Sequence, residues 1–348
     1  MHGTRSAPGK RVVVTGATGN VGTSVVTALA RDPEVGSVLG LARRRPKLWT
    51  EGVRWETVDL SEPASSGPLR DLLRGADAVV HLAWRFQPTH DPVVTWQSNV
   101  LGSIRVFEAA ADAGVPALVH ASSVGAYSPG PKEEPGVDEQ WPTNGWPDAA
   151  YCREKAYLER VLDTFELRHP EIRVVRMRPG FLFKESAASE QRRIFAGRYV
   201  PGGLFRPDLL PFVPDLEGLR FQVLHTDDAA EAYRLAVLGD ARGAFNLTAD
   251  SVTDARQLAE LFGARVVRVP RALVRTALAA AWQAHAVPAS PHLFDAVLRL
   301  PVLDSTRAHE VLGWRPVHTA AEALTAFLKG VRQGAGEDTA PLAGKRVG

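Results

Sequence analysis

Residues 11–22 read RVVVTGATGNVG and decide the fold. The run RVVV is typical of a short buried strand, and residues 20–31 have the pattern of a helix. Gly16, Gly19 and Gly22 lie in the turn between the two. Glycine allows a positive φ and lets the backbone come close to a ligand, so the turn can hold a pyrophosphate over the amino end of the helix. The alternative is a tight turn that binds nothing.

Strand-like and helix-like segments alternate through the first half of the chain. The expected strands are short runs rich in Val, Leu and Ala: Arg11–Thr15, Ser37–Ala42, Val53–Thr57, Ala78–Leu82 and Ala117–Ser122. The expected helices are Val21–Arg31, Leu69–Arg74 and Val93–Ala113. This order predicts an α/β fold, a Rossmann-type doubly wound parallel sheet with helices on both faces.

The second half is less regular. We expect a helix over Ala149–Leu167, a strand over Ile172–Met177, a loop-rich stretch over 184–222, a helix over Asp227–Leu238 with Thr226 or Asp227 as N-cap, and a strand over 243–247. The predicted domains are a dinucleotide-binding domain over 10–180, to which 219–247 returns, and a smaller C-terminal substrate-binding lobe over 181–218 and 248–331. Residues 332–348 are polar and Gly-rich, which predicts a disordered tail.

Composition excludes several classes of function. The 41 basic and 39 acidic side chains give a net charge of +2, so neither a nucleic-acid surface nor a membrane surface is expected. The single cysteine, Cys152, excludes an intrachain disulfide. With no apolar leader at the N-terminus, these features predict a cytoplasmic protein. The histidines are scattered, so no metal site is expected.

The chain resembles the extended short-chain dehydrogenases/reductases, the NAD(P)-dependent epimerase/dehydratase group. TGATGNVG matches their TGxxGxxG fingerprint. Further matches follow in the family's order: VDL (58–60), HLAW (81–84), NVLGS (99–103), ASSVGAY (121–127), YCREK (151–155), RMRPG (176–180), HTDDAAEAY (225–233) and LGWRP (312–316). The resemblance spans residues 10–330 and implies a nicotinamide dinucleotide as cofactor.

The residue that ends the second strand reads the adenosine ribose in this family, and an acid there favours NAD. Here the sequence is LGLARRRP (39–46), in which Ala42 replaces the acid and Arg43 and Arg44 follow. Guanidinium groups clamp phosphate by paired hydrogen bonds, which favours NADP(H), with NAD possible. The alternative is a solvated basic loop.

The resemblance also implies the remaining cofactor contacts. Asp59 and Leu60 would hold the adenine ring, and Asn99 would help order the site, unless it is an ordinary polar helix residue. The full expected set is Gly16, Thr18, Gly19, Asn20, Val21, Gly22, Arg43, Arg44, Asp59, Leu60, Leu82, Ala83, Asn99, Ala121, Tyr151, Lys155 and Pro179.

Tyr151 and Lys155 are four residues apart, which places both on one face of a helix. A phenol titrates near pH 10, and a neighbouring ammonium is expected to lower its pKa. The resemblance implies that Ser123, with Ser122 as the other candidate, holds the substrate oxygen. Tyr151 would then pass a proton while the nicotinamide passes a hydride, and Lys155 would bond the nicotinamide ribose.

Aromatic residues in loops indicate an apolar or ring-bearing substrate, or packing between the two lobes. The expected substrate contacts are Trp84, Phe86, Ser123, Trp146 and Phe181. Two departures from the family pattern weaken a sugar-nucleotide dehydratase. Phe221 stands where sugar-nucleotide epimerases and dehydratases carry a diphosphate-binding arginine. Val124 and Gly125 stand where many dehydratases carry an acidic pair.

Three functions are therefore considered. The first is an NADP(H)-dependent carbonyl reductase or alcohol dehydrogenase for a small molecule. The second is an NAD-dependent sugar-nucleotide epimerase. The third is a non-catalytic redox sensor, which the presence of Ser123, Tyr151 and Lys155 disfavours. Resemblance further implies a homodimer in which residues 93–113 and 149–167 of each copy form a four-helix bundle.

Overall fold

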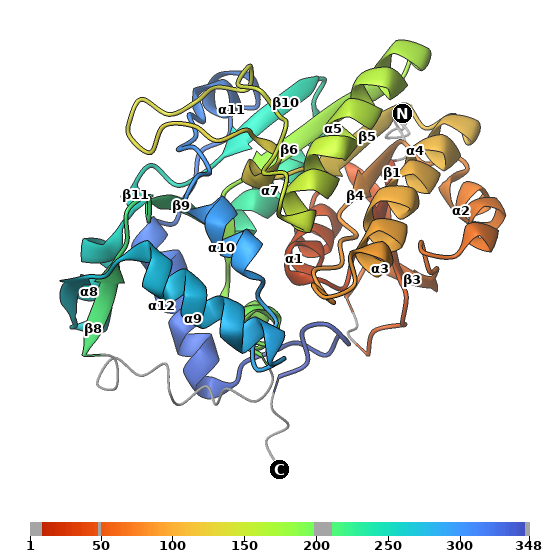
Figure 1. Ribbon diagram of the computed structural model, residues 1–348. Helices are drawn as coiled ribbons and strands as arrows, with labels where there is room; N and C mark the ends of the chain where they lie inside the picture. The colour runs from red at the N-terminus through yellow and green to blue at the C-terminus, as the bar shows by residue number, and fades with distance from the viewer. Residues whose placement is uncertain (1–8, 48–49, 198–210, 345–348) are drawn as a thin grey trace, which may run out of the picture.

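The computed structural model describes residues 9–47, 50–197 and 211–344 (Figure 1). Within these residues, seven strands form the central sheet in the order β10-β6-β5-β4-β1-β2-β3, and every neighbouring pair is parallel. The strands are β1 (Lys10–Thr15), β2 (Val35–Ala42), β3 (Val53–Thr57), β4 (Ala78–His81), β5 (Ala117–Ala121), β6 (Arg173–Pro179) and β10 (Gly243–Leu247). The strand order reverses at β1, so the predicted doubly wound Rossmann fold is confirmed.

Helices cover both faces of this sheet because alternate strand residues point to opposite sides. Val12 and Val14 face the cluster that contains α1 and α7, whereas Val13 faces the cluster that contains α2, α4 and α5. The helices are α1 (Asn20–Ala30), α2 (Ser66–Leu73), α3 (Pro92–Trp96), α4 (Gly102–Asp112), α5 (Ala150–Arg168) and α7 (Thr226–Leu238). The helix expected over 93–113 is divided, since a π-helical turn, η2 (Gln97–Leu101), joins α3 to α4.

The smaller lobe lies beside the large sheet, on the left of Figure 1. It contains a sheet of β11, β9 and β7, a β12–β8 pair, and several helices. Its elements are β7 (Phe181–Phe183), α6 (Ala188–Phe195), β8 (Phe212–Asp215), β9 (Phe221–His225), β11 (Val252–Thr253), α8 (Ala255–Phe262), β12 (Arg265–Arg268), α9 (Arg271–Gln283), α10 (Pro291–Val297) and α12 (Ala320–Gln333). The α11 helix (Thr306–Val311) packs against β10. Short 3-10 turns are η1 (Pro63–Ser65), η3 (Val124–Ala126) and η4 (Glu185–Ala187).

Several sequence expectations for the second half need correction. The stretch 184–222, expected to be loop-rich, contains α6 and β8. Of the segment 219–247, α7 and β10 return to the large sheet, but β9 pairs with β7 and β11. The N-cap of α7 is His225, whose side chain accepts a hydrogen bond from the Asp227 N–H, and neither Thr226 nor Asp227 caps it.

The C-terminal residues differ most from expectation. Arg332 and Gln333 complete α12, and the following residues fold back on the protein instead of forming a disordered tail. Thr339 and Leu342 are buried in this segment. Residues 345–348 lie outside the described part of the chain, as do residues 198–210 of the expected substrate lobe. No helix in the described ranges is long and apolar enough to cross a membrane.

Candidate active site

The glycine-rich turn between β1 and α1 has two glycines that the protein's own packing requires. Gly16 has φ +66°, and a Cβ there would lie 2.6 Å from the Ala83 nitrogen. A Cβ at Gly22 would lie 2.2 Å from the Gly16 oxygen. At Gly19 the nearest atom to a Cβ would be the Gly16 oxygen at 3.5 Å, which is ordinary contact. Packing within the chain therefore leaves Gly19 unexplained.

Gly19 is also the N-cap of α1, and no side chain caps this helix. The first N–H groups of a helix have no intrahelical partner, and they carry the positive end of its dipole. The open space at Gly19 and the uncapped helix start lie at the carboxyl end of β1. The turn thus presents backbone donors and room for an anionic group.

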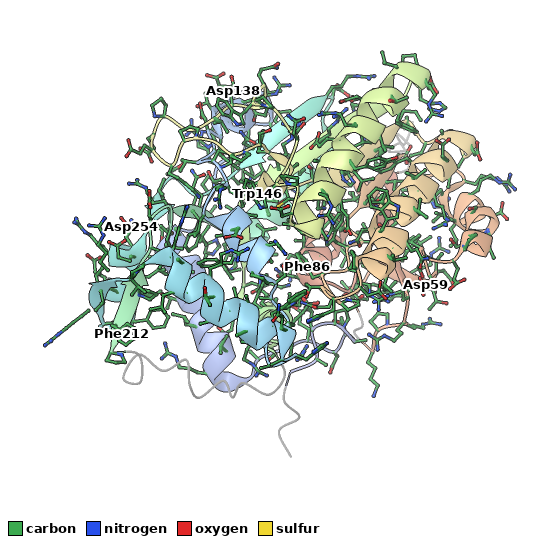
Figure 2. All side chains as sticks on the ribbon, in the orientation of Figure 1. Asp59, Phe86, Asp138, Trp146, Phe212 and Asp254 are labelled. Atoms are coloured by element: carbon green, nitrogen blue, oxygen red, sulfur yellow. The ribbon has the colours of Figure 1, made fainter. Side chains whose placement is uncertain are left out.

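Asp59 follows β3 at the same edge of the sheet (Figure 2). Its Oδ1 accepts hydrogen bonds from the Ser61 N–H at 3.0 Å and the Ser61 hydroxyl at 2.7 Å. Burial opposes ionisation of Asp59, but the Ser61 bonds and the charges of Arg43 and Arg85 outweigh it and lower the pKa. The next residue, Leu60, accepts a hydrogen bond from the Arg105 guanidinium at its carbonyl. Arg43 and Arg44 follow β2 and are exposed.

The predicted catalytic serine and tyrosine meet. The Tyr151 hydroxyl donates to the Ser123 Oγ at 2.8 Å, and the Ser123 Oγ also accepts from the Gly125 N–H. Ser122 is turned away, because its hydroxyl donates to Glu159 at 2.5 Å. The geometry therefore favours Ser123 over Ser122.

Gly125 is required by the position of this tyrosine. A Cβ at Gly125 would lie 2.6 Å from the Tyr151 Cε1. The family resemblance places an acidic residue of the dehydratases at this position. With Tyr151 placed as it is here, the Cβ of such a residue would clash with the tyrosine ring. In the sequence, this close packing was indicated by the glycine at position 125, where the family resemblance implied an acid.

Lys155 lies one turn further along α5, almost completely buried. Its ammonium donates to the Ala121 carbonyl at 2.6 Å and lies 3.5 Å from the centre of the Trp84 ring. Burial lowers the pKa of Lys155 to about 7, although the carboxylates of Glu154 and Glu159 act in the opposite direction. Burial also disfavours the charged form of Tyr151 and raises its pKa. The prediction that Lys155 lowers this pKa is therefore wrong.

Asn99 organises the loop that follows β4. Its Oδ1 accepts from the Arg85 N–H at 2.7 Å, and its Nδ2 donates to the Arg85 carbonyl and to Glu154. Asn99 lies in the π-helical turn η2, a kind of turn that is frequent at functional sites. Glu154 also accepts from the Thr95 hydroxyl, and burial raises its pKa. Sequence reasoning missed Glu154, although it lies between Tyr151 and Lys155.

Aromatic side chains cover the tyrosine. The Phe86 ring stacks on the Tyr151 ring with centroids 5.2 Å apart, and the Trp84 ring meets it edge-on at 5.6 Å. Beside them lies a cavity of about 240 Å³. It is lined by Trp84, Phe86 and Tyr151 together with Phe195, Trp282 and Leu293 from the smaller lobe. Sequence reasoning missed Trp282 and Leu293, which are more than a hundred residues distant from Tyr151.

The two other expected substrate residues lie elsewhere. Trp146 packs under the Arg299 guanidinium at 4.4 Å, and Phe181 packs edge-on against Phe221 at 5.3 Å. Neither residue lines the cavity beside Tyr151, and Ser123 is not among its lining residues either. Figure 2 shows Phe86 and Trp146 in the middle of the molecule, between α5 and the helices of the smaller lobe. The other expected cofactor residues, Leu82, Ala83, Ala121 and Pro179, lie at the carboxyl ends of β4, β5 and β6.

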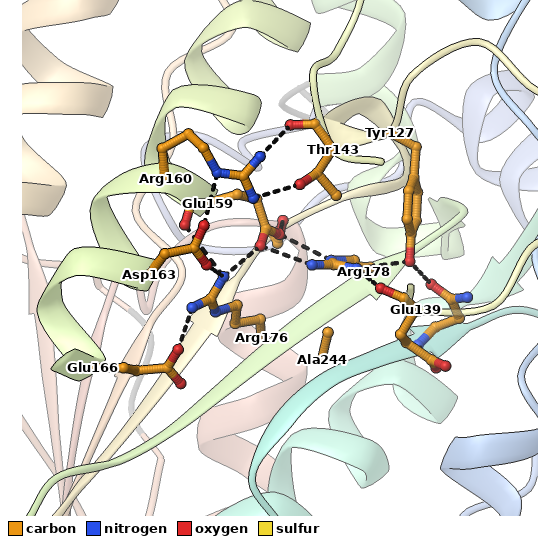
Figure 3. Close-up of polar contacts among 12 residues, drawn as sticks. Tyr127, Glu139, Thr143, Glu159, Arg160, Asp163, Glu166, Arg176, Arg178 and Ala244 are labelled. Atoms are coloured by element: carbon orange, nitrogen blue, oxygen red, sulfur yellow. Dashed lines mark hydrogen bonds and ion pairs between the residues drawn. The ribbon is translucent and has the colours of Figure 1, made fainter. Parts of the chain in front are cut away.

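A buried ionic network fixes α5 to the sheet (Figure 3). Arg178 of β6 makes two hydrogen bonds to the Glu159 carboxylate, at 2.9 and 2.8 Å, and a third to the Tyr127 hydroxyl. Arg176 bonds Glu159 at 3.0 Å and Asp163 at 2.7 Å. Burial opposes ionisation of Glu159, but the two arginines outweigh it and lower the pKa to about 2. The network holds the helix that carries Tyr151 and Lys155.

Comparison with known proteins identifies the class. The model of the NAD dependent epimerase/dehydratase family matches residues 12–247, and the chain belongs to that family of extended short-chain dehydrogenase/reductase enzymes. UDP-glucose 4-epimerase of Mycolicibacterium smegmatis is 28% identical over 344 residues, which cover 90% of this chain and 96% of that protein. L-arabinose 1-dehydrogenase (NAD(P)(+)) of Haloferax volcanii is 34% identical over 113 residues, 32% of this chain and 41% of that protein.

The fold recurs among solved structures. UDP-glucose 4-epimerase of Thermus thermophilus, solved in complex with NAD, has a TM-score of 0.69 and 22% identity, covering 92% of this chain and 99% of that one. At this level of identity the likeness shows the shared fold.

Proposed function

We propose that the protein is an NADP(H)-dependent carbonyl reductase or alcohol dehydrogenase in which Tyr151 is the acid–base group. The observation that carries this proposal is the 2.8 Å hydrogen bond between the hydroxyl of Tyr151, a residue that lines the cavity, and the Ser123 Oγ. Two adjacent hydroxyls, one of them a proton donor, can hold and protonate a substrate oxygen.

The glycine-rich turn supports binding of a nicotinamide dinucleotide. Gly19 leaves a space that no packing within the chain requires, and the uncapped start of α1 offers donors to a pyrophosphate. Arg43 and Arg44 beyond β2 favour a 2′-phosphate, and hence NADP(H) over NAD(H). When bound, the nicotinamide ring supplies or accepts the hydride.

The chain's own groups divide the remaining work. Ser123 holds the substrate oxygen, and Tyr151 gives it a proton in reduction or removes one in oxidation. Lys155, which donates to the Ala121 carbonyl, is placed to bond the nicotinamide ribose. The aromatic lining and the volume of about 240 Å³ suit a compact, apolar or ring-bearing substrate.

The second candidate is an NAD-dependent sugar-nucleotide epimerase. It is favoured by the near full-length relationship to the mycobacterial UDP-glucose 4-epimerase. This reaction would use Ser123, Tyr151 and Lys155 in the same roles, with oxidation and reduction of one substrate. The aromatic lining of the cavity beside Tyr151 favours the first candidate.

We also propose that this protein acts on a small molecule and forms a homodimer through α3, α4 and α5. The observation behind it is that Val93 of α3 and Leu101 of the adjoining turn η2 are large apolar residues with 61% and 37% exposure. Size-exclusion chromatography with static light scattering measures the mass of the protein in solution. Twice the chain mass of 37.6 kDa is expected, and a monomer would contradict the proposal.

The cofactor is tested first. Any dinucleotide released from the denatured protein is identified by mass, and NADPH and NADH are then titrated into the emptied protein. Freely exchanging NADP(H) is the expected result, whereas tightly retained NAD would favour the epimerase. The double substitution Ala42→Asp, Arg43→Ala should shift preference towards NADH, and unchanged preference would contradict the role of Arg43.

A further inference from the structure

The C-terminal residues form a compact loop. We call residues 335–344 the C-terminal loop. Gly334, with φ +67°, ends α12 and turns the chain back, and the Ala335 N–H donates to the Gly330 carbonyl. The loop closes on itself through the Glu337 N–H, which donates to the Leu342 carbonyl at 3.1 Å. Leu342 is fully buried.

Side chains from β7 to α6 anchor this loop. The Lys184 ammonium pairs with the Glu337 carboxylate at 3.0 Å, and the Ser186 hydroxyl donates to the same carboxylate. The Arg193 guanidinium donates to the carbonyls of Pro341 and Ala343. The loop is thus held by an ion pair and several hydrogen bonds on one side.

On its other side the loop touches both segments assigned above to the cofactor. The Thr339 hydroxyl, 2% exposed, donates to the Thr18 carbonyl in the glycine-rich turn at 2.9 Å. The Asp338 carbonyl accepts from the Lys47 N–H at 3.1 Å, just beyond Arg43–Arg45. In Figure 1 the chain runs from the end of α12 towards the N-terminal elements.

The contact at Thr18 fixes one peptide unit of the turn. The Thr18 carbonyl and the Gly19 N–H belong to the same planar unit. That N–H donates to the Gly16 carbonyl at 3.1 Å, while the carbonyl accepts from Thr339, so the unit is held at both ends. Its orientation sets the start of α1 at Asn20, where the backbone donors for a pyrophosphate lie.

We propose that Thr339 is a positioning residue for the dinucleotide, which braces the glycine-rich turn from outside in its binding conformation. This inference rests on the proposed dinucleotide binding. Both hydrogen-bonding roles of the Thr339 hydroxyl serve the brace, since it also accepts from the Leu342 N–H at 3.3 Å. A valine has the same shape and loses both roles, whereas a serine keeps both.

The test compares Thr339→Val with Thr339→Ser in the full chain. Thr325→Val is the matched control, because the Thr325 hydroxyl donates to the Ala321 carbonyl of its own helix and Thr325 is exposed. Dissociation constants for NADPH and NADH are measured by fluorescence titration, and amide hydrogen exchange is followed over residues 16–22 without dinucleotide. The exchange readout reports on the turn independently of binding or activity.

Thr339→Val should weaken binding of the preferred dinucleotide about tenfold, as expected for loss of one or two hydrogen bonds. Exchange over residues 16–22 should accelerate in the same variant. Thr339→Ser should stay within about twofold of the original protein on the same scale, and Thr325→Val should be unchanged. If Thr339→Val does not fold, Glu337→Gln, which loosens the loop at Lys184, should weaken binding about threefold.

Equal affinities and equal exchange in Thr339→Val and the original protein would overturn the brace and leave the proposed function standing. Weaker binding with unchanged exchange would also overturn it, because the turn itself would then be unaffected. An original protein that binds neither dinucleotide would overturn the proposed function and the brace with it.

Discussion

Two successive parts of α5 have opposite electrostatics. In the first part, burial favours the neutral forms of Tyr151, Glu154 and Lys155. It raises the pKa of Tyr151 and Glu154 and lowers the pKa of Lys155. One turn beyond Lys155, Glu159 is bonded to Arg176 and Arg178, and its pKa falls to about 2. The difference teaches that one helix can carry groups ready to exchange protons beside groups that stay ionised and hold the fold.

The largest effect is expected from breaking the first part. Tyr151→Phe removes the hydroxyl that bonds Ser123 and should lower the rate of hydride transfer about a thousandfold, while NADPH affinity stays within about twofold. Initial rates of NADPH oxidation with a carbonyl substrate measure this. Tyr157→Phe is the control, since Tyr157 is 45% exposed on the same helix. Equal rates in the two variants would contradict the assignment of Tyr151.

The next effect breaks the second part. Glu159→Gln leaves Arg176 and Arg178 without their buried counter-ion and should lower the free energy of unfolding by about 3 kcal/mol. Urea unfolding at pH 7 measures the loss. Glu166→Gln removes a partner of Arg176 that is 34% exposed and should cost less than about 1 kcal/mol. Similar losses in both variants would show that burial of Glu159 carries no special weight.

The smallest effect sharpens the contrast through pH. The pKa of Lys155 is about 7 in the folded protein and 10.5 ordinarily, so between these values the unfolded chain binds more protons. The free energy of unfolding therefore increases with pH between 7 and 10.5, and the contribution of Lys155 to it is lowest below pH 7. Between pH 7 and 9 the unfolding free energy of the original protein should rise by about 2 kcal/mol relative to Lys155→Met.

Urea unfolding at pH 7, 8 and 9 without dinucleotide measures that difference. Lys132, whose pKa burial lowers to about 8, contributes equally to both proteins and cancels. A difference that is constant with pH would mean that Lys155 is protonated throughout the range.

The sequence was sufficient where the fold depends on neighbours along the chain. The spacing of Gly16, Gly19 and Gly22 follows from the geometry of one turn, and that of Tyr151 and Lys155 from one turn of helix. The order of strands likewise follows from the alternation of short apolar runs with helices. These are local or topological constraints, and the structure has the sheet that they predict.

The remainder depends on contacts between distant segments. Trp282 and Leu293 reach the cavity only because α9 and α10 pack across Tyr151, and no local pattern marks them. The polar, Gly-rich composition of the C-terminal loop concealed the burial of Thr339 and Leu342. The contacts of this loop are with residues distant in the sequence, since Thr339 bonds Thr18 and Pro341 bonds Arg193. The pKa of Tyr151 was predicted in the wrong direction because burial, which a sequence does not display, dominates it.

The position of the C-terminal loop has a practical consequence for handling the protein. A purification tag or fusion partner joined after Gly348 would begin four residues beyond a loop that contacts Thr18 and Lys47. Lys10, the first residue of β1, lies at the amino ends of the parallel strands, on the edge of the sheet opposite to the glycine-rich turn. Ligand affinities should therefore be compared between proteins that carry the tag at the N-terminal end and at the C-terminal end.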